Sequence, residues 1–253
     1  MSEATILKIG GSVITDKTKD CTIDHGQLTW IAGALARHQG APLLVIHGAG
    51  SCGHPEARRY GLERGLVPGE PCGIYETHRS VARLNEAVVG ELRAAGIEAI
   101  GISPLAISCT EAGRLKSLEY RPLQLMMTAG LVPVLHGDVV MDLERGAAIL
   151  SGDQLLVHLA SLLHIRRVGL ATDVPGVLHQ GSVIPILRSS MVSGLAITGS
   201  RNTDVTGGME GKIQELIRLA SHGIESHIFH VSRLEDFMKG RAHGGTTIQG
   251  DPS

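Results

Sequence analysis

Six short apolar runs recur along the chain, and amphipathic segments separate them. The runs cover residues 4–9, 42–47, 97–102, 131–136, 167–171 and 225–229. Most positions in these runs are apolar, which is typical of strands that are covered on both faces. The runs are therefore predicted to be strands of one mostly parallel sheet.

Between these strands, apolar residues recur at the spacing of helices that bury one face. The pattern predicts helices over residues 24–38, 77–95, 153–164 and 208–222. Asp24 is a candidate N-cap of the first helix, and Gly96 and Gly223 are candidate C-caps. Ser232 and Glu235 have the spacing of a capping box, which predicts one more short helix.

Strands that alternate with helices predict an α/β fold whose sheet carries helices on both faces. No linker rich in Pro, Gly or Ser divides the 253 residues, so we expect a single domain. In open sheets of this kind, ligands bind at the carboxyl ends of the strands. Many of the 33 glycines cluster after the predicted strands, which makes these loops the candidate site.

Composition narrows the classes of function. The formal net charge is −2 and aromatic residues make up 2% of the chain, which argues against a nucleic-acid partner. The first apolar run is too short for a signal peptide, and no run reaches the roughly 18 residues of a membrane span, so we expect a cytoplasmic protein. The four cysteines lack the spacing of a zinc site, and we expect no disulfide framework.

The first glycine cluster is LKIGGSVITDK, in which Lys8 and Lys17 flank Gly10-Gly11-Ser12. Glycines let backbone amides approach an anion because no Cβ stands in the way. The cluster lacks the spacing of a P-loop. The alternative interpretation is a tight turn with two solvated lysines, and the pattern alone does not choose between them.

The second cluster is HGAGSCGHP, residues 47–55, which follows a predicted strand and precedes a helical pattern in ARRYGLERG. The N-terminus of a helix at this place would attract an anion. His54 could bind a phosphate oxygen or exchange a proton. The alternative for a lone histidine is a capping or packing role, but the glycines around His54 favour a functional one.

Two further clusters follow later strands. In ISGDQ, Asp153 follows Ser151-Gly152 and either caps the next helix or orients a lysine by charge pairing. In ATDVPGV and NTDVTGGMEGK, Asp173 follows a strand, and Gly207-Gly208 open a helix that contains Lys212. The latter pattern suits either a phosphate site or an ordinary glycine-rich loop with a surface lysine.

Three lysines near the glycine loops point together to a phosphate-rich ligand and to phosphoryl transfer. This chemistry depends on positioning and positive charge more than on a nucleophilic side chain. We expect Mg²⁺ to bridge the nucleotide phosphates with few protein carboxylates, and we predict no metal site built from protein residues.

The motifs KIGGS, VIHGAGS, TDVPGV and NTDVTGGMEGK together resemble the amino acid kinase superfamily. Within it, HGAGSCGHP followed by EARRYGL, SGDQ and the complete NTDVTGGMEGK resemble the isopentenyl phosphate kinases, from about residue 5 to residue 248. The resemblance implies a three-layer αβα sandwich with about eight strands. It also implies an acceptor half at about 1–165 and a nucleotide half at about 166–253.

The activity implied by this resemblance is transfer of the γ-phosphoryl group of ATP to isopentenyl phosphate, giving isopentenyl diphosphate for isoprenoid biosynthesis. ATP and Mg²⁺ are the implied cofactors, isopentenyl phosphate is the implied small-molecule substrate, and the chain is expected to form a homodimer. No nucleic-acid or membrane partner is expected.

The resemblance also assigns roles to individual residues. Catalytic roles fall on Lys8, Lys17, His54, Asp153 and Lys212. Acceptor binding falls on Ala49, Gly50, His54 and Gly152. Nucleotide binding falls on Lys8, Gly10, Gly11, Ser12, Gly50, Asp173, Gly207, Gly208 and Lys212. Among these, Lys17 would stabilise the transition state, and His54 would hold the acceptor phosphate.

One departure from the family pattern concerns the acceptor pocket. Cys52 stands where the family commonly has Phe, so an aromatic wall of the pocket is expected to be missing. The apolar lining is expected from the 77–95 helix and the 101–109 segment. A fixed charge there would instead favour an amino acid acceptor.

Three alternatives stay open on the residues alone. One is a kinase of another small phosphate or phosphonate acceptor, similar to the fosfomycin kinases, and a second is an amino acid kinase. The third is a nucleotide-sensing protein without catalysis, which could lose Lys17 or His54, yet this chain keeps both.

Overall fold

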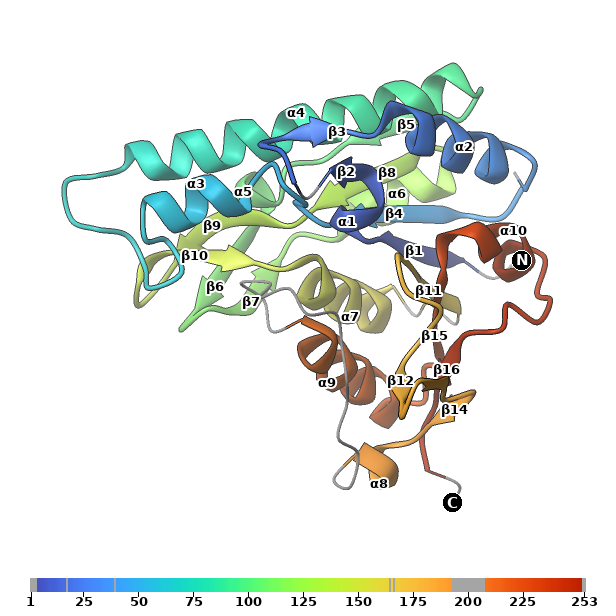
Figure 1. Ribbon diagram of the computed structural model, residues 1–253. Coiled ribbons are helices and arrows are strands. Elements are labelled where there is room, and N and C mark those ends of the chain that lie inside the picture. The colour runs from blue at the N-terminus through green and yellow to red at the C-terminus, as the bar shows by residue number, and fades with distance from the viewer. Residues whose placement is uncertain are drawn as a thin grey trace.

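An eight-stranded sheet forms the centre of the structure (Figure 1). Its strands are β1 (Thr5–Ile9), β4 (Leu43–His47), β5 (Ala99–Gly101), β8 (Val132–His136), β11 (Arg167–Thr172), β14 (Ile186–Leu187), β15 (Ser226–His230) and β16 (Thr246–Ile248). The structure is a computed structural model that describes residues 4–16, 18–38, 40–163, 165, 167–192 and 208–251. The strand order is β14-β16-β15-β11-β1-β4-β8-β5, and every neighbouring pair is parallel except β15 with β16.

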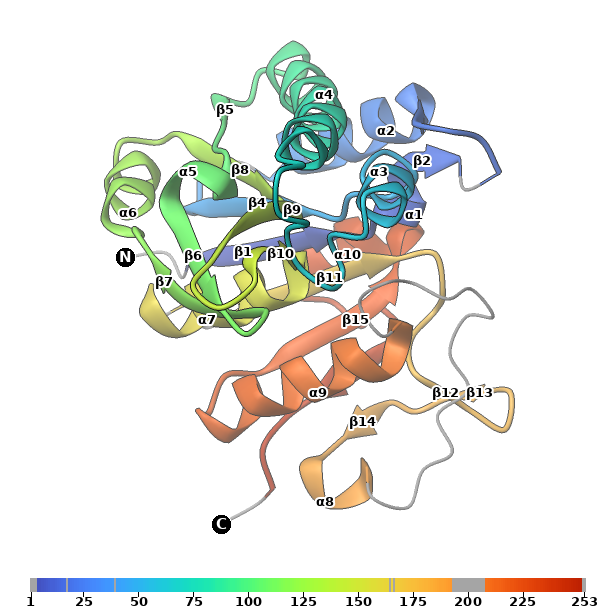
Figure 2. The ribbon, with the colours of Figure 1, turned by 90° about the vertical axis from the view of Figure 1, so that its left-hand side faces the viewer.

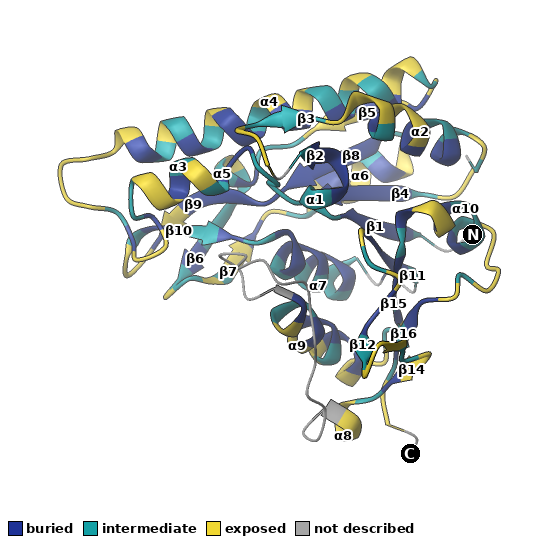
Figure 3. Cartoon of the chain, in the orientation of Figure 1, coloured by how far each residue is buried: buried dark blue, intermediate teal, exposed yellow. Residues whose placement is uncertain are grey.

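Helices cover both faces of this sheet, as predicted. Those on one face are α2 (His25–Ala36), α4 (Cys72–Ala94) and α10 (Leu234–Met238), and those on the other include α7 (Gly152–Leu162) and α9 (Gly208–Ser221). In β1, Ile6 packs into the core beneath α7 and α9, and Leu7 packs into the core beneath α2 and α4. Figure 3 shows the buried residues gathered on the sheet and on the inner helix faces. The fold is therefore the expected three-layer αβα sandwich.

Local chemistry explains where the helices begin. The Asp24 carboxylate accepts a hydrogen bond from the backbone amide of Gln27 at 2.8 Å, which confirms its role as N-cap of α2. Helix α4 begins at Cys72, earlier than the pattern predicted. A Cβ at Gly73 would lie 2.6 Å from the Cβ of Tyr60, so the glycine lets the first turn of α4 pack against the end of α3 (His54–Arg59).

The predicted capping box at Ser232 and Glu235 is wrong. A short 3₁₀ turn, η1 (Val231–Arg233), precedes α10, and the N-cap of α10 is Arg233 with no side-chain cap bond. Instead, the imidazole of His230 accepts a hydrogen bond from the backbone amide of Ser232 at 3.3 Å. The histidine thus caps η1, one turn before the helix that the serine was predicted to cap.

A second sheet was not predicted. It consists of β6 (Ser108–Glu111), β7 (Arg114–Leu118), β9 (Asp138–Asp142) and β10 (Gly146–Leu150), in the order β10-β9-β6-β7, and it faces the viewer in Figure 2. Strand β9 follows β8 directly, and β10 leads into α7, so this hairpin lies beside the carboxyl ends of the central strands.

The remaining elements are short. They are α1 (Gly11–Ile14), β2 (Thr15–Asp16), β3 (Thr22–Ile23), α5 (Pro104–Ile107), α6 (Arg121–Thr128), β12 (Leu178–His179), β13 (Ser182–Val183) and α8 (Ser189–Val192). Within the described part of the chain, no helix combines the length and the apolar character needed to cross a membrane.

Candidate active site

A cleft of about 440 Å³ opens at the carboxyl ends of the central strands. Eleven of the residues singled out in the sequence line it: Lys8, Gly10, Gly11, Ser12, Ala49, Gly50, His54, Gly152, Asp153, Asp173 and Lys212. Gly208 begins α9, one turn before Lys212. Lys17 and Gly207 lie outside the described residues. The fold thus brings the separate glycine clusters together around one cavity.

Lys8 and Asp153 form a buried ion pair at the base of the cleft. The Lys8 Nζ lies 2.6 Å from the Asp153 Oδ1, and the two residues are 5% and 6% exposed. The N-cap of α7 is Ser151, whose hydroxyl accepts a hydrogen bond from the backbone amide of Gln154. Asp153 therefore pairs with a lysine, which was one of its two interpretations, and does not cap the helix, which was the other.

The first two glycine loops are in direct backbone contact. A Cβ at Gly11 would lie 2.2 Å from the backbone nitrogen of Gly50. Gly50 has a φ of +57°, and a Cβ there would lie 2.2 Å from the Thr15 hydroxyl oxygen. Because no side chain fits between these loops, they present backbone groups to the cleft.

A cradle of backbone amides lies where the second loop meets the start of α7. A Cβ at Gly137 would lie 3.4 Å from the backbone nitrogen of Gly152, 3.9 Å from that of Ala49 and 3.4 Å from the carbonyl oxygen of Leu150. No hydrogen bond between described residues uses either amide. The N-terminus of α7 adds a partial positive charge. We call Ala49, Gly137 and Gly152 the amide cradle, and its size and polarity suit one anionic group.

Sequence reasoning missed Gly137, although a signal was present. Gly137 follows His136 at the end of β8, as Gly48 follows His47 at the end of β4. The two histidines are in register on neighbouring parallel strands. The repeated His-Gly pair therefore marked a second loop at the same edge of the sheet.

Two further cations at the rim of the cleft were also missed. Lys19 lies 3.3 Å from the Asp16 carboxylate, and the Arg58 Nε lies 3.8 Å from the Glu63 carboxylate. Both side chains are largely exposed and both residues line the cleft. Together with Lys212 they extend the positive charge around the opening, where the imidazole of His54 also lines the cleft.

The apolar wall of the cleft differs from the expected one. Ala57, Thr77, Val81, Ile149 and Leu150 line it, whereas no residue of the segment 101–109 does. That segment instead forms the end of β5, helix α5 and the start of β6. The expectation is therefore confirmed for the α4 helix and wrong for 101–109, whose place is taken by β10.

The expectation for Cys52 is wrong in two respects. Its side chain is fully buried in the core beneath α2 and α4 and does not line the cleft, so it neither forms nor removes a wall of the pocket. Cys52 also forms a disulfide with Cys21, although no disulfide was expected. The bond joins the loop before β3 to the second glycine loop, two segments that lie far apart in the sequence.

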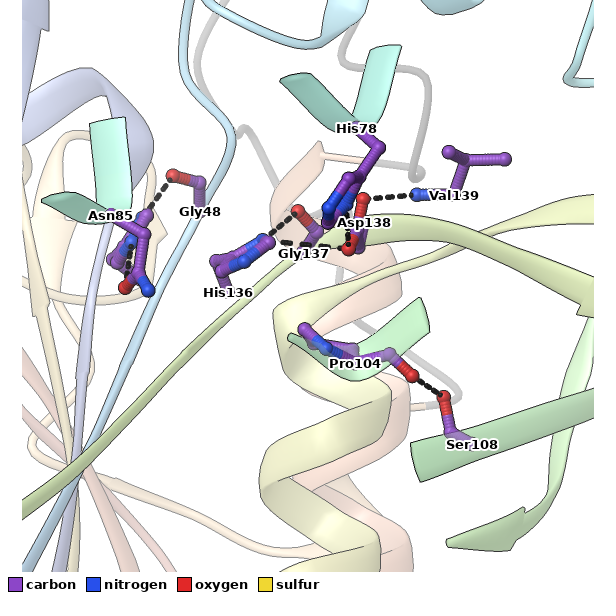
Figure 4. A network of polar contacts seen from close by, with 10 residues as sticks. Gly48, His78, Asn85, Pro104, Ser108, His136, Gly137, Asp138 and Val139 are labelled. Carbon is purple, nitrogen blue, oxygen red and sulfur yellow. Dashed lines mark hydrogen bonds and ion pairs between the residues drawn. The ribbon is translucent and has the colours of Figure 1, made fainter. Parts of the chain in front are cut away.

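Three imidazoles and one carboxyl group form a network beside the cleft, which Asp138 also lines (Figure 4). The rings of His47 and His136 stack with centroids 5.6 Å apart. The His78 Nδ1 lies 2.9 Å from the Asp138 Oδ2, and the His47 Nε2 lies 3.1 Å from the Asn85 Oδ1. Sequence reasoning did not single out any of these residues for this role.

The members of the network differ in their pKa shifts, because some are buried without a charged partner and others form a pair. Burial lowers the pKa of His47 and lowers the pKa of His136 to about 3, so both rings are neutral at physiological pH. The hydrogen bond to Asp138 raises the pKa of His78. Burial raises the pKa of Asp138. The charge that this network holds is therefore confined to the pair of His78 and Asp138.

Comparison with known proteins identifies the family. The model of the amino acid kinase family matches residues 3–230. Isopentenyl phosphate kinase of Haloferax volcanii is 40% identical over 97% of this chain and 98% of its own length, and that of Methanothermobacter thermautotrophicus is 37% identical over 97% and 98%. An X-ray structure of isopentenyl phosphate kinase superposes with a TM-score of 0.85 at 33% identity, covering 97% of this chain and 100% of the other. The chain therefore belongs to the amino acid kinase family and, within it, to the isopentenyl phosphate kinases.

Proposed function

We propose that this protein transfers the γ-phosphoryl group of ATP to isopentenyl phosphate and so forms isopentenyl diphosphate for isoprenoid biosynthesis. The observation that carries the proposal is the position of the Lys8–Asp153 pair and the amide cradle in one cleft. The cleft thus offers a fixed cation for the transferred group beside a site for a second phosphate. An acceptor that already bears a phosphate fits this arrangement.

In this proposal the acceptor phosphate lies on the amides of Ala49 and Gly152, and His54 binds it from α3. One of its oxygens attacks the γ-phosphorus of ATP while the bond to the ADP oxygen breaks. The attacking oxygen is already anionic, so the step requires no nucleophilic side chain from the protein. The protein's part is to align the two phosphates and to stabilise charge.

Lys8 is proposed to stabilise the negative charge on the transferred group, because Asp153 holds its ammonium in one place. The nucleotide is proposed to bind to two groups of residues. One is the loop of Gly10, Gly11 and Ser12 together with Gly50, and the other consists of Asp173, Gly207, Gly208 and Lys212. Lys17 is proposed to stabilise the transition state.

Mg²⁺ bound together with ATP would supply positive charge that offsets the charge of the nucleotide phosphates. In the part of the chain that the structure describes, no three His, Cys, Asp or Glu side chains group to hold a metal ion. An ion at this place would therefore take most of its ligands from phosphate oxygens and water.

The acceptor half is proposed to span about 1–165 and the nucleotide half about 166–253 of one domain. By family resemblance we also propose a homodimer, which light scattering of the purified protein would test. An amino acid acceptor is less well supported, because both oxygens of the buried Asp138 are already bonded, to the His78 imidazole and to the Val139 amide. The Asp138 side chain also has no exposed surface, so it offers no open carboxylate to an amino group.

The decisive experiment measures ADP release from Mg-ATP with isopentenyl phosphate, with fosfomycin, with an amino acid and without acceptor. ADP release with isopentenyl phosphate, with the diphosphate identified by mass, would support the proposal. The His54→Gln variant should raise the KM for isopentenyl phosphate by about ten-fold or more, because a charge-assisted hydrogen bond is lost, and should keep the thermal midpoint. ADP release no higher with isopentenyl phosphate than without acceptor would exclude this function.

A further inference from the structure

The pair formed by His78 and Asp138 joins two elements that also share an apolar cluster, to which Ile74 and Val139 belong. His78 is on α4 and Asp138 begins β9. The His78 Nδ1 donates to the Asp138 Oδ2 at 2.9 Å, and the Asp138 Oδ1 accepts from the backbone amide of Val139 at 2.9 Å. The Asp138 side chain is fully buried, and the His78 side chain is 26% exposed. Such a pair holds its two elements at a defined distance.

The residues beside this pair belong to the two parts of the proposed acceptor site. On α4, Thr77 precedes His78 and Val81 lies one turn after it, and both line the cleft. On the other side, Asp138 directly follows Gly137 of the amide cradle. The bond from His78 to Asp138 therefore spans from the wall of the cleft to the cradle beside it.

The neighbouring Thr77 does not duplicate this connection. Its hydroxyl oxygen is buried and has no hydrogen-bond partner. On the stretch of α4 that lines the cleft, the polar connection to β9 thus runs through His78.

We propose that His78 is a positioning residue for the acceptor, because its bond to Asp138 fixes the distance between the α4 wall and the amide cradle. This inference rests on the proposed function of the cleft. His78 acts through Asp138 and not by contact with the reacting atoms.

This arrangement makes acceptor binding depend on pH. Asp138 faces His78 from β9, and His136 faces it from the end of β8, with ring centroids 6.3 Å apart. His136 is neutral because burial lowers its pKa to about 3. Since the bond to Asp138 raises the pKa of His78, the charge of His78 is lost as the pH rises through the raised pKa. On the acid side the pair is lost as Asp138 becomes protonated, because burial raises the pKa of that carboxyl group.

The test compares wild type with His78→Asn and His78→Phe in steady-state kinetics from pH 6 to 9. Asn keeps a neutral N–H donor near the place of Nδ1, whereas Phe keeps a ring without a donor. We expect the KM for isopentenyl phosphate to rise about ten-fold in His78→Phe and less in His78→Asn, because a charge-assisted hydrogen bond is lost. The KM for ATP should stay unchanged, and both variants should lack the alkaline rise in acceptor KM that the imidazole causes in wild type.

The matched control is His25→Asn, which breaks an exposed pair between the His25 Nδ1 and Glu91 on the far part of α4, 3.3 Å apart. It should leave the acceptor KM and its pH profile unchanged. If wild type forms ADP but His78→Phe keeps the wild-type acceptor KM and pH profile, the positioning role is wrong. The same holds if both KM values and kcat change together with the thermal midpoint. If wild type forms no ADP with isopentenyl phosphate, the proposed function fails instead.

Discussion

The two ends of the cleft are held in different ways. At the end where we propose that the phosphates bind, which we call the phosphate end, the backbone of Gly11 contacts the backbone of Gly50, and a buried ion pair with Asp153 fixes Lys8. At the apolar wall, a helix is held to a strand by the side chains of His78 and Asp138. Where two backbones are in contact, no larger residue can replace the glycines. Where two side chains are in contact, either residue can be substituted without a change in the path of the loops. The difference suggests a rigid frame for phosphoryl transfer and an adjustable wall for the acceptor.

The largest effect should come from the phosphate end. Lys8→Met removes the fixed cation, and we expect kcat to fall by about 100- to 1,000-fold, as for other charge-stabilising groups. The variant also leaves Asp153 buried without its lysine, which should lower the free energy of unfolding by about 3–5 kcal/mol. Enzyme assays and urea unfolding measure the two effects.

A double variant separates stability from catalysis at Lys8. Lys8→Met combined with Asp153→Asn should regain part of the lost stability, because no carboxylate remains buried without a partner, but it should not regain activity. Activity of Lys8→Met within ten-fold of wild type would contradict the role given to this lysine.

A smaller effect is expected from filling the amide cradle. Gly137→Ala places a Cβ 3.4 Å from the backbone nitrogen of Gly152, in the space proposed for an acceptor oxygen. Since Gly137 does not have a positive φ, the backbone can accept the alanine. We expect the KM for isopentenyl phosphate to rise about ten-fold with an unchanged KM for ATP, since about one hydrogen bond to an anion is disturbed. An equal rise in both KM values would place Gly137 outside the acceptor site.

The smallest effect is expected from substituting a glycine that does not line the cleft. Gly90 is within α4, and a Cβ there would meet no atom within 4 Å. Gly90→Ala should therefore raise the free energy of unfolding by about 0.5–1 kcal/mol, because alanine favours helix. Kinetic constants should match wild type. A loss of activity would show that a glycine substitution outside the cleft can also disturb it, and the Gly137→Ala result could then not be assigned to the amide cradle.

The glycine loops that line the cleft could be located from the sequence because each of them is continuous in the chain. Lys8 is next to its glycines, and residues 47–54 form the second loop without interruption. The role of Asp153 stayed open, because its partner Lys8 is 145 positions away. A local pattern shows that a carboxylate follows a glycine, but not which cation it meets.

The apolar wall was harder to predict for a physical reason. Strand β9 buries both of its faces at most positions, so it lacks the alternation that identifies a hairpin strand. The β9–β10 hairpin was therefore missed, and with it the place of Asp138 and Ile149 beside the cleft. Cys52 was misplaced because its neighbours line the cleft while its own side chain points into the core.

The disulfide between Cys21 and Cys52 has a consequence for the protein as a chemical substance. It closes a covalent ring, with the cysteines 31 positions apart, that contains α2 and β4. Thr18, Lys19 and Asp20, which line the mouth of the cleft, directly precede Cys21, and His54 closely follows Cys52. In a sample kept with a reducing thiol the two cysteines would be free thiols, and in a sample kept in air they would be joined as the disulfide. The two forms differ by two hydrogen atoms. In one of them the two rims of the cleft would no longer be tied to each other by a bond.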